Sequence, residues 1–390
     1  MANGNHLLRR AAKSAVANVL HYSGARRAIA AARRLRAGGR RILILSYHRV
    51  VDDFTGEVQR SIPGLLISRE TFRRHLDEVQ SAGFDVVSLE DALNVISGER
   101  AAKRDVCVIT FDDGYRDIYR HAFPLLRELG LPATIYLASG FVGTDKRFNH
   151  DRLFHLLLLA QKRRLRPMYE LLPTQAVSLL EPVLAGAESA SGAVDRFLSE
   201  ATGSVALRVI EGLAEQLGGG EETSPEQGDV MTWEDARRMA DAGISFGAHT
   251  VGHSVLPLEE PERAEWEILE SRTEIERQLG RPCLDFAYCN GWYSDELVRM
   301  LTRAGYRSAV TTEDLPNRVG GDPYTLKRKV LWENFSLGFD GGYSSCLTGC
   351  QIDDVFTSLG AGSVVIGRRA QRAQASIPLF TEPEPLHGGF

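Results

Sequence analysis

The sequence lacks long apolar runs and has few cysteines, and both features narrow the class of protein. No run in the 390 residues approaches the roughly 18 apolar residues that a membrane-spanning helix needs. The apolar fraction, 43%, is that of an ordinary globular protein. The five cysteines are an odd number, which does not fit the disulfide framework of a small secreted protein. We therefore expect reduced thiols, Cys346 and Cys350 included, and a cytoplasmic protein.

Acidic residues are absent from residues 1–41, which hold ten Arg or Lys, so the remaining chain carries a net charge of −15 (−5 minus +10). Apolar residues such as Leu8 and Val19 recur at helical spacing in this basic arm. The arm is either a helix bound peripherally to the inner, anionic face of a membrane or a solvated helix that packs on the protein. A signal peptide is not expected, because the apolar stretch from Ala15 to Leu20 is too short. No base-reading motif accompanies the arm, so we expect no nucleic-acid partner.

Two adjacent carboxylates, Asp112 and Asp113, directly follow a short apolar run. The run, residues 106–109, is rich in β-branched side chains, and Gly114 follows the pair. This pattern predicts a buried strand that ends in a turn. Like charges so close raise each other's pKa unless a cation or a proton is shared. A pair of this kind standing alone is more often a solvated turn.

A second apolar stretch, residues 244–246, leads to His249 and His253. Standing alone, such a pair is often a surface feature of a helix. One Asp with two His is, however, a three-ligand metal set that leaves a coordination position open for water, as catalytic sites do. Zinc suits this set best, and cobalt, nickel and manganese are compatible with it. The other Asp is then free to act as a base.

Helix and strand signals alternate along most of the chain. Repeated units of helix, glycine and strand predict a parallel sheet, and functional residues at the carboxyl ends of several strands favour a barrel over residues 42–338. Residues 145–228 interrupt the alternation as a helical insertion that loosens over 186–228. The insertion is either a lid over the barrel mouth or a peripheral helical element. The Gly-rich segment and Pro/Glu tail of residues 339–390 predict little order.

By position and residue type, these motifs resemble the polysaccharide deacetylase family (carbohydrate esterase family 4). Three further segments resemble the same family: residues 46–50 (SYHRV), 286–291 (FAYCNG) and 326–328 (LKR). The likeness covers roughly residues 42–144 and 229–331. It implies the fold class α/β, with a distorted, incomplete (β/α) barrel that here carries the helical insertion.

The resemblance also implies a role for each matched residue. In the family, the first Asp of the pair is the catalytic base and the second is a metal ligand. Carried over, Asp112 is the base, and Asp113, His249 and His253 hold a divalent metal, with Zn²⁺ the first expectation. The backbone N–H of Asn290 would stabilise the oxyanion.

The chain departs from the family pattern around residue 288. Ala287 stands where one branch has an arginine that orients the base, and Cys289 stands where proline is usual. Arg328 resembles the relocated arginine of a sister branch. The alternative is that Arg328 is a salt-bridged surface residue.

The family's late histidine, which serves as general acid, has no counterpart in the barrel of this chain. No histidine lies between His253 and His387, and His387 belongs to the tail. His48, after the first core strand, is the remaining candidate, since an early histidine fills that role in a permuted branch. The alternative is that His48 is a structural hydrogen-bonding residue.

The resemblance implies a metal-dependent hydrolase that removes an acetyl group from an N-acetylated sugar in a polysaccharide or a lipid-linked glycan. Two other classes stay open. One is a catalytically idle glycan-binding protein on the same scaffold, which the changes at Ala287 and Cys289 favour and the intact Asp and His set opposes. The other is a same-fold amidohydrolase that acts on small non-sugar amides.

Overall fold

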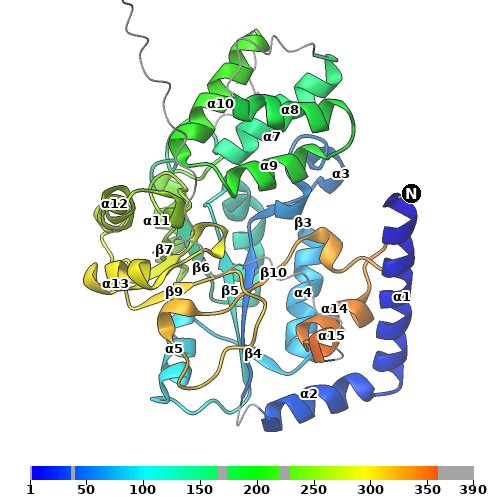
Figure 1. Cartoon of the computed structure of the whole chain (residues 1–390). Helices are drawn as coiled ribbons and strands as arrows, with labels where there is room; N and C mark the ends of the chain where they lie inside the picture. Colours follow the sequence, from blue (N-terminus) through cyan, green and yellow to red (C-terminus); the bar gives the residue numbers. More distant parts are fainter. Residues whose placement is uncertain (1, 37–39, 166–173, 219–228, 359–390) are drawn as a thin grey trace, which may run out of the picture.

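A curled parallel sheet forms the centre of the molecule (Figure 1). The computed structural model describes residues 2–36, 40–165, 174–218 and 229–358. Within them the sheet runs in the order β10-β1-β5-β6-β7-β8-β9, and β4 pairs with β5. The strands are β1 (Ile42–Tyr47), β4 (Phe84–Val86), β5 (Asp105–Phe111), β6 (Thr134–Leu137), β7 (Ser245–Ala248), β8 (Asp285–Ala287), β9 (Ser308–Val310) and β10 (Lys329–Val330). Two short strands, β2 (Arg49–Val51) and β3 (Leu66–Ser68), form a separate parallel pair.

The two edges of the sheet approach each other through residues 326–330. Val310, at the end of β9, forms a parallel bridge with Leu326, and Lys329 pairs with Leu45 of β1. This segment therefore lies between the last and first strands of the path, and the predicted distorted, incomplete barrel is confirmed. The apolar run of β5 is buried along its whole length, as expected for a parallel strand covered on both faces.

Helices connect the strands and begin where the sequence places caps. The hydroxyls of Ser68, Ser88 and Thr232 each accept a backbone N–H in the first turn of the helix that follows. Helices around the sheet are α3 (Phe54–Glu57), α4 (Arg69–Ser81), α5 (Leu89–Ser97), α6 (Phe123–Leu129), α11 (Trp233–Asp241), α12 (Pro261–Leu279) and α13 (Asp295–Arg303). A π-helical turn, Ile118–Ala122, precedes α6, and short 3₁₀ turns span Pro63–Leu65, Leu256–Leu258, Cys289–Gly291, Pro323–Thr325 and Glu333–Phe335.

The insertion is a helical bundle with its own apolar core. Its helices are α7 (Asn149–Lys162), α8 (Thr174–Leu184), α9 (Ala190–Leu198) and α10 (Gly203–Gln216), and they lie together at the end of the sheet where β1 finishes (Figure 1). The prediction that residues 186–228 loosen is wrong over α9 and α10. Their Gly and Ser residues argue against a helix, but the buried residues, for example Val209 and Leu213, recur at helical spacing. Residues 219–228 lie outside the described part.

The basic arm is helical, as its apolar spacing predicts, and it forms two helices, α1 (Ala2–Tyr22) and α2 (Ala25–Arg36). Ala17 of α1 lies in one apolar cluster with Cys346 and Cys350, and Arg26 of α2 forms buried ion pairs with Glu78 and Asp353 (2.7 Å each). Of the two interpretations of the arm, the geometry matches the helix that packs on the protein. An arm attached in this way is part of the folded unit.

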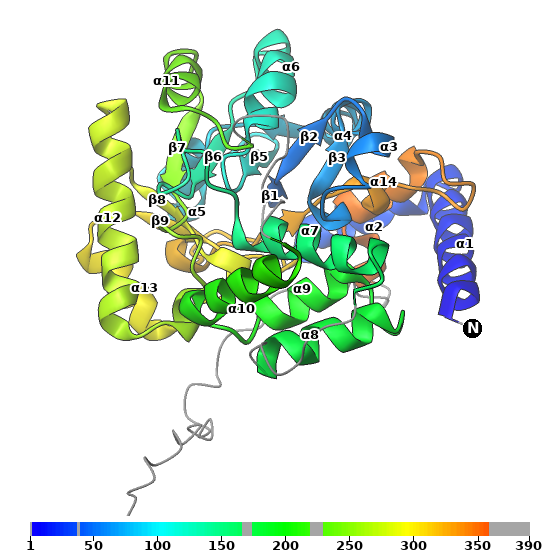
Figure 2. The ribbon, with the colours of Figure 1, turned by 90° about the horizontal axis from the view of Figure 1, so that it is seen from above.

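The segment after residue 338 is more ordered than predicted. Helix α14 (Ser345–Ile352) lies beside α1 (Figure 2), and α15 (Val355–Ser358) contacts α2. The expectation of little order is wrong there, because the stability of these helices comes from apolar contacts with the distant arm rather than from their own composition. The tail from residue 359, which includes His387, lies outside the described residues.

Membrane association stays a prediction. No helix in the described ranges is both long and apolar enough to cross a bilayer. The side of α1 that faces away from the protein exposes Val19 and Tyr22, which are 67% and 82% accessible. Co-sedimentation of the full chain with anionic vesicles tests whether this surface binds lipid; recovery of the protein in the supernatant would contradict it.

Candidate active site

The two carboxylates stand at the carboxyl end of β5 and point in different directions. Asp113 has a φ of +71° and Gly114 a φ of +85°, so the chain turns in the left-handed region immediately after the strand. Both carboxylates are buried, with 2% of Asp112 and 1% of Asp113 exposed. In a regular strand, adjacent side chains reach different partners only by pointing to opposite faces of the sheet. Here the turn itself directs the two carboxylates to different partners.

Asp112 is held by a guanidinium from the segment that joins the edges of the sheet. Nη1 and Nη2 of Arg328 donate to Oδ1 and Oδ2 of Asp112, each at 2.7 Å. Arg328 also donates from Nε to the carbonyl of Thr311 at 2.9 Å and is 1% exposed. Arg328 is therefore not a surface residue. A bidentate pair of this kind fixes the plane of the carboxylate.

Asp113 faces the imidazoles of His249 and His253. Its Oδ1 lies 3.1 Å from Nε2 of His253 and 3.5 Å from Nε2 of His249. Although these atoms are close, Oδ1 is buried and has no hydrogen bond of acceptable geometry. Three potential ligand atoms thus converge without satisfying one another. A buried polar atom left in this state is unfavourable unless something else binds it, and a divalent cation suits this donor set.

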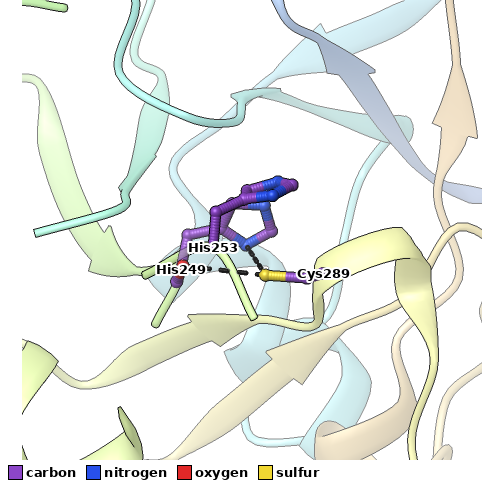
Figure 3. A group of neighbouring side chains, drawn as sticks. All are labelled: His249, His253 and Cys289. Carbon is purple, nitrogen blue, oxygen red and sulfur yellow. Dashed lines mark hydrogen bonds between the residues drawn. The ribbon is translucent and has the colours of Figure 1, made fainter. Parts of the chain in front are cut away.

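His249 is oriented by the next strand. Its Nδ1 lies 2.7 Å from the carbonyl of Ala287, to which it donates, so Nε2 carries the lone pair. The sulfur of Cys289 lies 3.8 Å from Nδ1 (Figure 3), and His249, His253 and Cys289 form a group with potential ligand atoms within 4.8 Å of one another. Cys289 is on the Nδ1 side, however, and burial raises the pKa of its thiol well above the usual value. Asp113, which faces Nε2, is the better third ligand.

The electrostatics keep both carboxylates ionised. Burial raises the pKa of Asp112, but the Arg328 guanidinium outweighs it and holds that pKa below its usual range. Burial also raises the pKa of Asp113, and His253 more than reverses the change. Burial lowers the pKa of His249 to about 4, so this imidazole is neutral near pH 7. Burial lowers the pKa of His253, but the neighbouring Asp113 carboxylate opposes this, and the net pKa lies above its usual value. A cation that binds there therefore competes with a proton.

Of the other predicted site residues, His48 lies next to the proposed base and Asn290 lies on a separate turn. Nε2 of His48 lies 4.0 Å from Oδ2 of Asp112, and Nδ1 of His48 is buried without a hydrogen-bond partner in the described part. His48 therefore stands beside the predicted base. Asn290 is the exposed residue of the turn Cys289–Gly291 after β8, with a φ of +56°, and the other two residues of that turn are buried. The role given to Asn290 concerns its backbone N–H, and it stays a prediction.

The insertion contributes side chains next to this site. Tyr115 donates from its hydroxyl to Asp151 at 2.7 Å and lies 2.7 Å from Nε2 of His150. The His150 ring packs edge-on against His253 with 5.2 Å between ring centroids. Since Tyr115 has a single proton, Nε2 of His150 must be the donor in the second contact. The start of α7 therefore contacts the site.

One residue beside the site was missed by sequence reasoning. Glu267, on α12, is fully buried and accepts hydrogen bonds from the loop that carries His253. In the sequence it stands among Glu265, Glu270 and Glu274, a pattern that reads as a solvated helical face. The one available signal was its place on the apolar side of the helix, in phase with Ala264, Ile268 and Ile275.

A match to a family profile identifies the family of this chain. The profile of the polysaccharide deacetylase family matches residues 99–170 and 186–309. The putative polysaccharide deacetylase YxkH of Bacillus subtilis is 20% identical over 302 residues, which cover 77% of this chain and 75% of that protein. The poly-β-1,6-N-acetyl-D-glucosamine N-deacetylase of Staphylococcus epidermidis is 29% identical over 135 residues. That match covers 33% of this chain and 44% of the relative, so it extends over less than half of the relative.

Among solved structures, IcaB from Ammonifex degensii superposes with a TM-score of 0.51 at 17% sequence identity. The superposition covers 81% of this chain and 98% of IcaB. At this level of identity the likeness concerns the fold.

Proposed function

Because the chain belongs to the polysaccharide deacetylase family, we propose that it is a metal-dependent hydrolase that removes an acetyl group from an N-acetylated sugar in a polysaccharide or a lipid-linked glycan. The observation that carries the proposal is the convergence of the unsatisfied Oδ1 of Asp113 with two imidazole Nε2 atoms. A second buried carboxylate, fixed by Arg328, adjoins this cluster. An idle glycan-binding protein would have no need for either arrangement.

Asp113, His249 and His253 would hold the divalent metal, zinc being the first expectation. Such an ion would act as a Lewis acid that polarises the acetyl carbonyl and lowers the pKa of water. The neutral state of His249 and the ionised state of Asp113 are those that metal ligation requires.

Asp112 is the proposed general base. In the hydrolysis, the oxygen of water bonds to the acetyl carbon, and Asp112 takes the proton that this oxygen loses. The C–N bond then breaks, the nitrogen takes up a proton, and acetate and a free amine remain. Arg328 keeps the carboxylate ionised and fixes its direction, so it acts as a positioning residue.

His48 is the proposed general acid, because an amine anion is a very poor leaving group. His48 lies beside the proposed base and, unlike His249 and His253, is not assigned to the metal. We expect His48→Ala to keep its metal content and to lose turnover by at least about 10²-fold, the lower end of what general acid catalysis contributes. Turnover measured at matched metal occupancy checks this. Near-normal turnover would assign the proton to another donor.

The substrate class is proposed from the relatives. Since the Staphylococcus epidermidis relative is named for poly-β-1,6-N-acetyl-D-glucosamine, β-1,6-linked N-acetylglucosamine oligomers are the first substrates to test. Acetate release from these oligomers, from β-1,4-linked oligomers and from small N-acetyl amides separates the candidate functions. We expect release from at least one saccharide and none from the small amides. Binding of saccharides without acetate release would indicate the idle scaffold instead.

A further inference from the structure

The loop between His249 and His253 has a backbone that needs outside support. Thr250 has a φ of +64° and His253 a φ of +55°, both in the left-handed region that residues other than glycine rarely adopt. Such conformations persist where the surroundings over-determine them. The loop turns sharply enough here to bring the Nε2 atoms of both histidines to the same carboxylate oxygen.

A single carboxylate from α12 provides that support. Oε2 of Glu267 accepts the backbone N–H groups of Val251 (2.7 Å) and Gly252 (2.8 Å). Oε1 accepts the hydroxyl of Ser254 (2.9 Å) and a guanidinium N–H of Arg263 (2.7 Å). Glu267 is 0% exposed, so its charge is neutralised by these four donors rather than by solvent.

We propose that Glu267 is a positioning residue for the metal: its carboxylate fixes the 249–253 loop in the conformation that places His253 opposite Asp113. The inference rests on the proposed function in that these residues are taken as the metal ligands. Glu267 contacts the backbone of Val251 and Gly252 and the hydroxyl of Ser254, and it accepts no hydrogen bond from either imidazole among the described contacts. It therefore acts through the shape of the loop.

The chemistry of the contact makes Glu267→Gln informative. Glutamine has nearly the same size, but one of its two terminal groups is an NH₂ that cannot accept a hydrogen bond. With the NH₂ toward the loop, the backbone N–H groups of Val251 and Gly252 both face a donor. With the NH₂ on the other side, the Ser254 hydroxyl can turn and accept, but the Arg263 guanidinium faces a donor and the charge that neutralises it is gone. Glu267→Asp keeps the charge and both acceptors but is shorter by one methylene, so it can reach only part of the donor set.

A matched control separates positioning from stability. Glu333 is also a buried carboxylate, 9% exposed, and it accepts the backbone N–H of Ser68 (2.7 Å) and the hydroxyl of Thr71 (2.8 Å) at the start of α4. Its partners are in the cap of another helix rather than in the 249–253 loop. Glu333→Gln therefore disturbs a comparable buried network without touching the loop.

The experiment measures the dissociation constant for Zn²⁺ by competition with a chromophoric chelator, using full-length protein below its unfolding temperature. We expect Glu267→Gln to weaken Zn²⁺ binding by about 10–100-fold, the range for partners that orient metal ligands. Glu267→Asp should lie between wild type and Glu267→Gln, and Glu333→Gln should lower the unfolding temperature but stay within about twofold of wild-type affinity.

Two outcomes would overturn the proposal. Wild-type affinity in folded Glu267→Gln would show that the loop holds its shape without the carboxylate. An equal loss of affinity in Glu333→Gln would assign the effect to general destabilisation. If Glu267→Gln does not fold, the test rests on Glu267→Asp. An unchanged Zn²⁺ affinity in Glu267→Asp would then contradict the proposal. Absence of Zn²⁺ binding by wild type would instead reject the proposed metal site itself.

Discussion

Replacing His249 or His253 by alanine is expected to abolish binding of a divalent cation and, with it, hydrolysis. The Nε2 atoms of both histidines lie within 3.5 Å of Asp113 Oδ1. An alanine removes one of three protein ligands of a site that leaves its remaining position to water. We expect wild type to hold about one ion per chain and both variants to hold none after dialysis. Elemental analysis of the purified proteins, with turnover on the same samples, provides the measurement.

The control for this prediction is His121→Ala. His121 lies outside the cluster and pairs with Asp52 at 3.2 Å. It should keep the wild-type metal content. Equal metal in wild type, His249→Ala and His253→Ala would reject the assignment of these ligands, and loss of metal in His121→Ala as well would point to unfolding rather than to ligation.

Asp112→Asn should separate catalysis from metal binding. Asparagine has the shape of aspartate but cannot take a proton from water, so we expect a loss of turnover of about 10²–10⁴-fold with the metal retained. Asp113→Ala should lose both. If Asp112→Asn loses the metal and Asp113→Ala retains it, the two roles are exchanged.

Asp112→Asn also leaves Arg328 buried without its charge partner, so the variant should be less stable. Breaking a buried ion pair by removing one member costs about 3–5 kcal/mol. Asp285→Asn is the matched control, because Asp285 is 4% exposed and forms a similar two-point pair with Arg307 (3.0 Å each) at the first residue of β8. It should lose stability and keep turnover. A comparable loss of turnover in Asp285→Asn would contradict the role given to Asp112.

The sequence predicts the barrel well because its signals are local. The apolar runs of β1 and β5 and the capping hydroxyls of Ser68 and Ser88 determine strands and helix starts without reference to distant residues. The sequence does not predict helices α9, α10 and α14, since their Gly and Ser content argues against order. Helices α9 and α10 pack on the other helices of the insertion, and α14 packs on the distant arm. Tertiary packing overrides composition in these segments.

The residues of the candidate site also differ in how far the sequence predicts their positions. Parallel strands bring their carboxyl ends to one edge, so the proximity of Asp113 to His249 and His253 follows from strand order. Arg328 lies 216 positions from Asp112, and only the family resemblance placed the two together. Glu267 carried no chemical signature, because a glutamate that binds backbone N–H groups looks like any helical glutamate in sequence.

The most direct test of the proposed activity follows one preparation through removal and return of its metal. Acetate and new free amine are measured on an N-acetylglucosamine oligomer with the metal-loaded protein, after complete chelation, and after addition of Zn²⁺. The proposed mechanism predicts equimolar acetate and amine from the loaded protein, neither after chelation, and both again after Zn²⁺ is restored. Undiminished acetate release from fully metal-free protein would contradict it.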